Sequence, residues 1–159
     1  MGGLVIFFAT WFPWLLGVVP IVYEFFMRNE GETMRALARI YLPPSIVYLA
    51  TLGIKLFFPS PRPFASLDIP PLVVGDNPYG SFPSSHAAFF AALGMTMYFC
   101  NPKLGKWFIA GAVLIGVARM AAGLHWPTDI LAGLGLGCAL GWATEKVLLV
   151  IWKKQNPQC

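Results

Sequence analysis

Charge is what this sequence has least of. Only 11% of its 159 residues are Asp, Glu, Lys or Arg, whereas 57% are hydrophobic. Soluble domains usually carry about 25% charged residues, so the composition argues against a chain that faces water on all sides. The net charge of +4 is scattered singly between apolar blocks, without the basic stripe that is typical of nucleic-acid-binding proteins. We therefore expect a membrane protein with no nucleic-acid partner.

Cysteine is also scarce. The three cysteines have no paired spacing, which predicts neither a disulfide framework nor a zinc site. The first ten residues lack the basic region of a signal peptide, and no small-residue cleavage site follows. We therefore interpret the first apolar segment as retained. The length suits one compact domain, so we expect residues 1–159 to form a single membrane-embedded unit.

What the sequence has instead is long apolar stretches. A helix needs about 20 apolar residues to cross the hydrocarbon core of a bilayer. The chain offers about five such stretches and so predicts an all-α integral membrane bundle of about five transmembrane helices, at residues 4–27, 37–58, 83–100, 107–121 and 127–151. Between them, residues 59–82 are rich in Pro, Gly and Asp and predict an ordered loop. Glycines in the last span predict close helix packing, at Gly133, Gly135, Gly137 and Gly141.

Basic residues predict the orientation. With five spans, three basic clusters fall on one side: Arg28, Arg35 and Arg39, then Lys103 and Lys106, then Lys153 and Lys154. The positive-inside rule makes that side cytoplasmic. We therefore expect the C-terminus in the cytoplasm and the loop at residues 59–82 outside.

Other ionisable residues lie near the opposite ends of the spans, where charge is expensive and tends to be functional. Three cations among them, Lys55, Arg62 and Arg119, suit a phosphate ester, whose negatively charged oxygens must be neutralised before a nucleophile can attack. Arginine grips two oxygens with a planar fork, whereas lysine acts as a point charge. Ser84 and the N–H groups that begin the following helix are further donors for an anion.

The only two histidines of the chain, His86 and His125, lie in the same segments. Neutral imidazole is a nucleophile. His125 precedes Asp129 by four residues, and a helix that starts at Pro127 lets this carboxylate accept a hydrogen bond from the second ring nitrogen. Taken singly, each group has a plainer interpretation, such as a structural histidine, a helix cap at Asp129 or a snorkelling lysine. Both histidines falling into one pattern favours catalysis.

These segments together resemble the type 2 phosphatidic acid phosphatase family, membrane lipid phosphatases related to the vanadium haloperoxidases. The family pattern is Lys-x6-Arg-Pro, then Pro-Ser-Gly-His, then Ser-Arg-x5-His-x3-Asp. The chain matches it from Lys55 to Asp129, with Ser85 in place of the glycine and Ala118 in place of the first serine. Many members have six spans, whereas we count five here.

The resemblance implies a division of roles. His125 forms a phosphohistidine, Asp129 steadies it, and His86 acts as general acid and base. The phosphate-binding residues are Lys55, Arg62, Ser84, Ser85 and Arg119. No metal and no cofactor are implied.

The resemblance also implies a function and a location. We expect a hydrolase that removes phosphate from a phosphate monoester or pyrophosphate of a lipid, in a bacterial inner membrane, with its site facing the periplasm. Family members act on undecaprenyl pyrophosphate, phosphatidylglycerol phosphate, phosphatidic acid or lipid A 1-phosphate, and the sequence does not choose among them. A non-catalytic lipid or anion transporter with the same cationic pocket is the alternative. Vanadate-dependent haloperoxidase chemistry fits the small, membrane-spanning chain less well.

Overall fold

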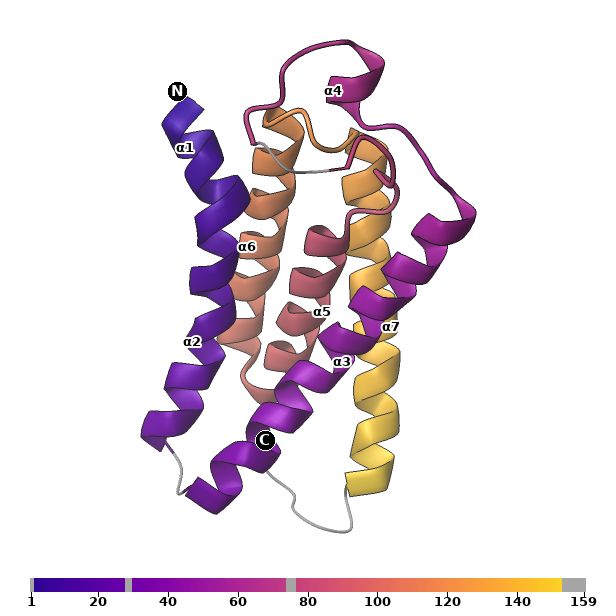
Figure 1. Cartoon of the computed structure of the whole chain (residues 1–159). Coiled ribbons are helices and arrows are strands. Elements are labelled where there is room, and N and C mark those ends of the chain that lie inside the picture. Colours follow the sequence, from indigo (N-terminus) through magenta and orange to yellow (C-terminus); the bar gives the residue numbers. More distant parts are fainter. Residues whose placement is uncertain (1, 28–29, 74–76, 153–159) are drawn as a thin grey trace.

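The helices run up and down in one bundle (Figure 1). The computed structural model describes residues 2–27, 30–73 and 77–152. Its elements are α1 (Gly2–Ile6), a π-helical segment η1 (Phe7–Trp11), α2 (Phe12–Met27), α3 (Glu30–Phe57), α4 (Pro63–Ser66), α5 (Ser85–Cys100), α6 (Pro102–Ala121) and α7 (Pro127–Trp152). The predicted all-α fold is confirmed. The expected loop at residues 59–82 carries the short helix α4.

Four helical segments of the described chain are long and apolar enough to cross a membrane: Gly2–Phe26, Glu32–Phe57, Pro102–Ala121 and Pro127–Ile151. The fifth expected span is α5, which has only 16 residues. At 1.5 Å per residue it is about 24 Å long, shorter than the ~30 Å hydrocarbon core. Ten of its residues are buried, and it packs against α3, α6 and α7. It is the central helix of the bundle, sheltered from lipid by its neighbours.

Capping residues set two helix starts that differ from the expected ones. The Asn101 side chain accepts hydrogen bonds from the backbone N–H groups of Lys103 and Leu104, at 3.0 and 3.3 Å. Because Pro102 suits the first helical position, α6 begins there and not at residue 107. Ser84 caps α5 in the same way by accepting from Ala87 N at 3.4 Å, so α5 begins two residues after the predicted start.

Three glycines of α7 allow it to lie directly against α5. A Cβ atom at Gly133 would approach Ser84 O to 2.6 Å, and one at Gly137 would approach Ala88 O to 2.3 Å. A Cβ atom at Gly141 would lie 2.9 Å from Ala92 Cα. Any side chain at these positions would therefore separate the helices. The predicted close packing is confirmed for these three, but it is wrong for Gly135, which faces open space because it is out of step with their four-residue spacing.

The second long helix begins before the expected span at residue 37. Helix α3 begins at Glu30, and Arg39 is only 8% exposed. Its guanidinium lies 3.4 Å from the carboxylate of Glu145, a fully buried residue of α7. Arg39 therefore joins two helices, and removing one partner of such a buried pair costs about 3–5 kcal/mol. Arg28, Lys153 and Lys154 lie outside the described residues.

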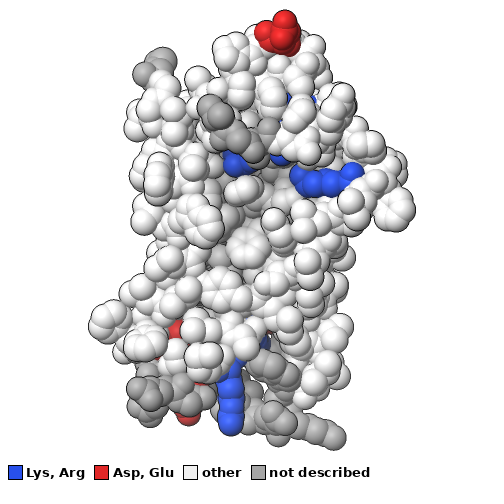
Figure 2. Space-filling model, viewed as in Figure 1, with Lys and Arg blue, Asp and Glu red and all other residues white. Residues whose placement is uncertain are grey.

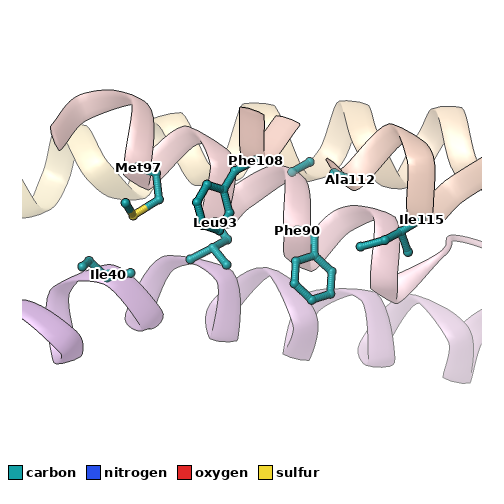
Figure 3. Packing of buried hydrophobic residues seen from close by; sticks show 8 residues of the cluster. Ile40, Phe90, Leu93, Met97, Phe108, Ala112 and Ile115 are labelled. Carbon is teal, nitrogen blue, oxygen red and sulfur yellow. The ribbon is translucent and has the colours of Figure 1, made fainter. Parts of the chain in front are cut away.

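Apolar side chains from α3, α5 and α6 form the main core (Figure 3). The largest cluster of buried residues includes Ile40, Phe90, Leu93, Met97, Phe108, Ala112 and Ile115.

The cysteines differ from expectation at one position. Cys100, at the end of α5, is disulfide-bonded, which the cysteine spacing did not predict. Cys138 in α7 is free. The core holds the ends of α3, α5, α6 and α7 in fixed positions around the groups described next.

Candidate active site

The predicted site residues meet at one end of the bundle, although they come from separate elements (Figure 1). The contributions are Lys55 from the last turn of α3, Arg62 from the N-cap of α4, Ser84 from the N-cap of α5, Ser85 and His86 from the first turn of α5, Arg119 from the last turn of α6, His125 from the α6–α7 turn, and Asp129 from the first turn of α7. Figure 2 shows the basic side chains in two bands, one toward each end of the bundle.

His125 is held by both of its ring nitrogens. Nδ1 lies 2.9 Å from the backbone oxygen of Ser81, and Nε2 lies 3.4 Å from Nη1 of Arg62. A guanidinium only donates hydrogen bonds, so Nε2 is the acceptor and the proton belongs on Nδ1. The Nε2 lone pair is therefore directed toward the cationic groups, as a nucleophile for a bound phosphate requires.

Ser81 connects His125 with Asp129. Its hydroxyl donates to Asp129 Oδ2 at 2.5 Å, while its carbonyl accepts from His125 Nδ1. The same carboxylate oxygen accepts from Trp126 N at 2.8 Å and lies 3.6 Å from His125 Nδ1. The expected acceptor for His125 was Asp129, but the nearer acceptor is Ser81 O, because Asp129 is engaged by Ser81 and Trp126. Ser81 was not among the predicted site residues. The only feature of the sequence that could have indicated its role is its position two residues before Pro83.

The cations are fixed by backbone carbonyls. Lys55 Nζ donates to Gly80 O at 2.6 Å. Arg62 donates through Nε to Asn77 O at 2.7 Å and through Nη1 to Leu124 O at 2.9 Å. Arg62 thereby ties the loop that carries it to the turn that carries His125. Gly80 has a φ of +82°, a conformation that glycine adopts without strain, and this turn brings its carbonyl to Lys55.

Arg119 is held by the first helical segment of the chain. Its Nη1 donates to Ala9 O at 3.3 Å, and the arginine is only 6% exposed. Pro13, four residues after Ala9, has no N–H and so cannot make the α-helical hydrogen bond to the Ala9 carbonyl. Ala9 also packs against Ala118 in a small buried cluster, which is where alanine replaces the family's serine. The amino-terminal helix therefore contributes directly to this end of the bundle.

The residues at the start of α5 have distinct surroundings. His86 lies within electrostatic range of Arg119, His125 and Lys55. The Ser84 hydroxyl caps α5, and the Ser85 hydroxyl accepts a hydrogen bond from Thr51 of α3 at 2.8 Å. The Ser85 side chain, which replaces a glycine, thus also links α5 to α3. Within the described part of the chain, no group of three or more His, Cys, Asp or Glu side chains is placed to hold a metal ion.

Burial and charge keep His125 neutral. Its burial lowers the pKa from the ordinary 6.5 to about 4, although the nearby Asp129 carboxylate acts in the opposite direction. Arg119, Arg62 and Lys55 lower the pKa further because they repel an imidazolium. Near neutral pH the ring is therefore unprotonated at Nε2 and able to form a bond to an electrophile.

The family model described as "PAP2 superfamily" matches residues 37–154. The chain belongs to this superfamily. A bacitracin transport permease protein BcrC of Bacillus licheniformis is 28% identical over 86% of this chain and 66% of its own length. An undecaprenyl-diphosphatase BcrC of Bacillus subtilis is 33% identical over 61% of this chain and 48% of its own length. A lipid A 1-phosphatase of Rhizobium etli is 39% identical over 43% of this chain and 28% of its own length. Each match covers less than two thirds of the relative's length.

Two solved structures resemble the bundle. The crystal structure of Aquifex aeolicus LpxE matches with a TM-score of 0.70 at 25% identity, over 90% of this chain and 86% of that one. A transmembrane PAP2-type phosphatidylglycerolphosphate phosphatase from Bacillus subtilis matches with a TM-score of 0.61 at 25% identity, over 98% and 76%. The integral membrane fold is therefore confirmed. The segments α1, η1 and α2 lie outside the residues that the PAP2 family model matches. The Ala9 carbonyl that contacts Arg119 belongs to η1.

We predict that Ser81→Ala lowers turnover while leaving the fold intact. The variant keeps the carbonyl that accepts from His125 but loses the hydroxyl that fixes Asp129, and a misplacement of about 1 Å in a catalytic group can cost ~10²-fold. We expect a fall of about 10- to 100-fold in kcat with little change in KM, measured as phosphate release. If the loss of activity were accompanied by a loss of helical content in circular dichroism, Ser81 would instead only support the fold.

A second prediction concerns the titration of His125. In a His86→Gln variant, His125 is the only histidine, and nuclear magnetic resonance of the labelled ring should give a pKa of about 4. Adding inorganic phosphate should raise this pKa because the anion offsets the three cations. Since the unfolded chain takes up the proton near pH 6.5 and the folded chain only near pH 4, the Tm should fall as pH decreases between these values. A pKa near 6.5 without phosphate contradicts the buried, cation-surrounded geometry.

Proposed function

We propose that this chain is a phosphatase that hydrolyses a phosphate monoester or pyrophosphate of a membrane lipid through a phosphohistidine. The observation that carries the proposal is the geometry of His125. Its Nε2 atom faces Arg62 at 3.4 Å and its Nδ1 atom is fixed by Ser81 O at 2.9 Å. A buried neutral imidazole among cations suits attack on an anionic phosphorus centre. The names of the relatives, a lipid A 1-phosphatase and an undecaprenyl-diphosphatase, support the same reaction class.

The first step transfers the phosphoryl group to His125. Nε2 attacks phosphorus, the P–N bond forms, and the bond from phosphorus to the leaving oxygen breaks. The bound phosphate offsets the charge of the three cations and so favours a protonated His86. This imidazolium gives its proton to that oxygen, so the leaving group departs neutral at this atom. The phosphorylated ring keeps its proton on Nδ1, where Ser81 O accepts it and the Asp129 carboxylate, 3.6 Å away, offsets the positive charge.

The second step returns the enzyme to its starting state. His86, now neutral, takes a proton from a water molecule whose oxygen attacks phosphorus. The P–N bond breaks, inorganic phosphate leaves, and His125 is again neutral at Nε2. Lys55, Arg62 and Arg119 bind the phosphoryl oxygens in both steps, and N–H groups at the start of α5 beside Ser84 and Ser85 add donors. The proposed mechanism uses these cations in the place that a divalent metal takes in other phosphatases.

The position of the site supports a location for the reaction. Lys103 and Lys106 lie at the start of α6, at the end of the bundle opposite the site. By the positive-inside rule that end faces the cytoplasm. The proposed site therefore opens to the periplasmic side of an inner membrane, with the C-terminus cytoplasmic, and its lipid enters from the outer leaflet.

We predict that His125→Ala abolishes phosphate release from folded protein in detergent. Loss of a catalytic nucleophile costs on the order of 10⁶-fold in kcat, so the residual rate should approach the background. The matched variant is His86→Gln, tested with radiolabelled p-nitrophenyl phosphate. Its leaving group needs no proton, so the labelled phosphohistidine should form and then accumulate because no base activates water. Phosphate release by His125→Ala, or radiolabelled phosphate bound covalently to it, would contradict the proposed mechanism.

A further prediction concerns metal and substrate. Release of phosphate should be unchanged by an excess of EDTA, because three side-chain cations supply the charge. Undecaprenyl pyrophosphate, phosphatidylglycerol phosphate, phosphatidic acid and lipid A 1-phosphate should be compared at equal mole fraction in detergent. The largest kcat/KM identifies the lipid class, whereas equal values would mean that the site selects only a phosphate on an apolar anchor. Loss of activity in EDTA that Mg²⁺ restores would contradict the metal-free mechanism.

A transport function is the second candidate, because one relative is named a transport permease protein. A transporter built on the same cationic pocket binds a lipid phosphate and releases it intact. It does not need His86 or His125, since the cations alone recognise the anion. Phosphate release by the purified chain, lost in His125→Ala, separates the two functions because a transporter yields no inorganic phosphate.

A further inference from the structure

A pocket of about 720 Å³ lies between α2, α3 and α5, and it reaches the candidate active site. Ser85 and His86 line the end of the pocket at the start of α5. Most of the remaining wall is aromatic or aliphatic and includes Trp14, Val18, Tyr48, Leu49, Phe89 and Phe90. The pocket is therefore continuous with a group that protonates the leaving oxygen in the proposed reaction.

The direction of the pocket follows the helices. Along α2 its lining extends from Pro13 to Ile21, eight residues or about 12 Å of helix. The parts of the lining that come from α2 and α3 belong to the two segments Gly2–Phe26 and Glu32–Phe57, which are long and apolar enough to cross a membrane. A ligand whose phosphate lies beside His86 would thus place its apolar part along α2, at the depth of the bilayer core.

Gly17 forms part of the wall. A Cβ atom at this position would meet only Phe90 Cε1, at 4.0 Å, which is an ordinary contact. A longer side chain would extend into the pocket. The Tyr41 hydroxyl donates to the Gly17 carbonyl, so α2 and α3 are joined at this level. Gly111 differs, because a Cβ atom there would lie 2.7 Å from Leu16 Cδ2, so that glycine serves helix packing.

We propose that this pocket binds the first part of one hydrocarbon chain of the phosphorylated lipid, and that Gly17 determines which lipids fit. The inference rests on the proposed phosphatase function and adds to it a site for the apolar part of the substrate. Burial of a methylene group contributes about 0.8 kcal/mol, so a chain seated on these side chains adds binding free energy that a water-soluble phosphate lacks. The glycine leaves the space that this chain occupies.

The test compares Gly17→Ala and Gly17→Leu in the full chain in detergent, with Gly135→Leu as the matched control. Gly135 is a helical glycine that faces open space on α7 and does not line the pocket. The substrates are dioleoyl phosphatidic acid, which carries long chains, and p-nitrophenyl phosphate, which carries none. Phosphate release gives kcat/KM for each pair of protein and substrate.

Gly17→Leu should lower kcat/KM for the lipid by about 10- to 200-fold, the range for one poorly fitted apolar group. Its activity on p-nitrophenyl phosphate should stay within about twofold of the wild type, because the phosphate site is untouched. Gly17→Ala and Gly135→Leu should behave as the wild type on both substrates. Equal losses on both substrates, or an unchanged rate on the lipid, would overturn the assignment.

Binding measured directly keeps the inference separate from the phosphatase proposal. Native mass spectrometry should show that Gly17→Leu retains less phosphatidic acid than Gly135→Leu, even in a His125→Ala background that releases no phosphate. If the wild type releases no phosphate while this difference in binding remains, the proposed function fails and the chain site stands. Equal retention of phosphatidic acid by both variants would overturn the assignment. So would a Gly17→Leu variant that loses phosphatidic acid and uncharged diacylglycerol equally and keeps its turnover, because a bulk bilayer lipid would then fill the pocket.

Discussion

The site depends on holding three positive charges close together at one end of an apolar bundle. Like charges repel, and each is costly to place away from water. Apart from the contact between Arg62 and His125 Nε2, the described hydrogen bonds of Lys55, Arg62 and Arg119 end on backbone carbonyl oxygens. Carbonyls satisfy the donors without adding a negative charge. In the proposed reaction, an anionic phosphate would relieve this repulsion when it binds, which would link ligand binding to the stability of the loop and helix ends that carry these side chains.

Hydrophobic patterning was sufficient to predict the helices but not the partners of their polar residues. Apolar length located the spans, because a bilayer requires that length. The pattern gave no sign of the ion pair of Arg39, which was grouped with the basic residues of the cytoplasmic side. Its partner Glu145 is 106 residues away in the sequence, and no local pattern records that pairing. The start of α6 was misplaced because the capping of Asn101 and Pro102 outweighs the polarity of the two lysines that follow.

The candidate site was predictable to the extent that it uses side chains in an ordered pattern. Three short segments were enough to name the two histidines and the three cations. The groups that orient them were not predictable, because Ser81 O and Ala9 O are backbone atoms, which every residue possesses. Only the path of the chain brings Ser81 to His125 and the Ala9 carbonyl to Arg119.

The shortness of α5 has a consequence for the solvent around the reacting phosphate. This helix is about 24 Å long, and its first turn carries His86. Figure 1 shows that turn lying below the adjacent ends of α6 and α7. In the proposed reaction, a lipid head group would therefore pass below the ends of α6 and α7 and shed part of its hydration shell to reach the histidines. Bilayer thickness would then be a variable of that proposed reaction, since a thicker membrane deepens the descent.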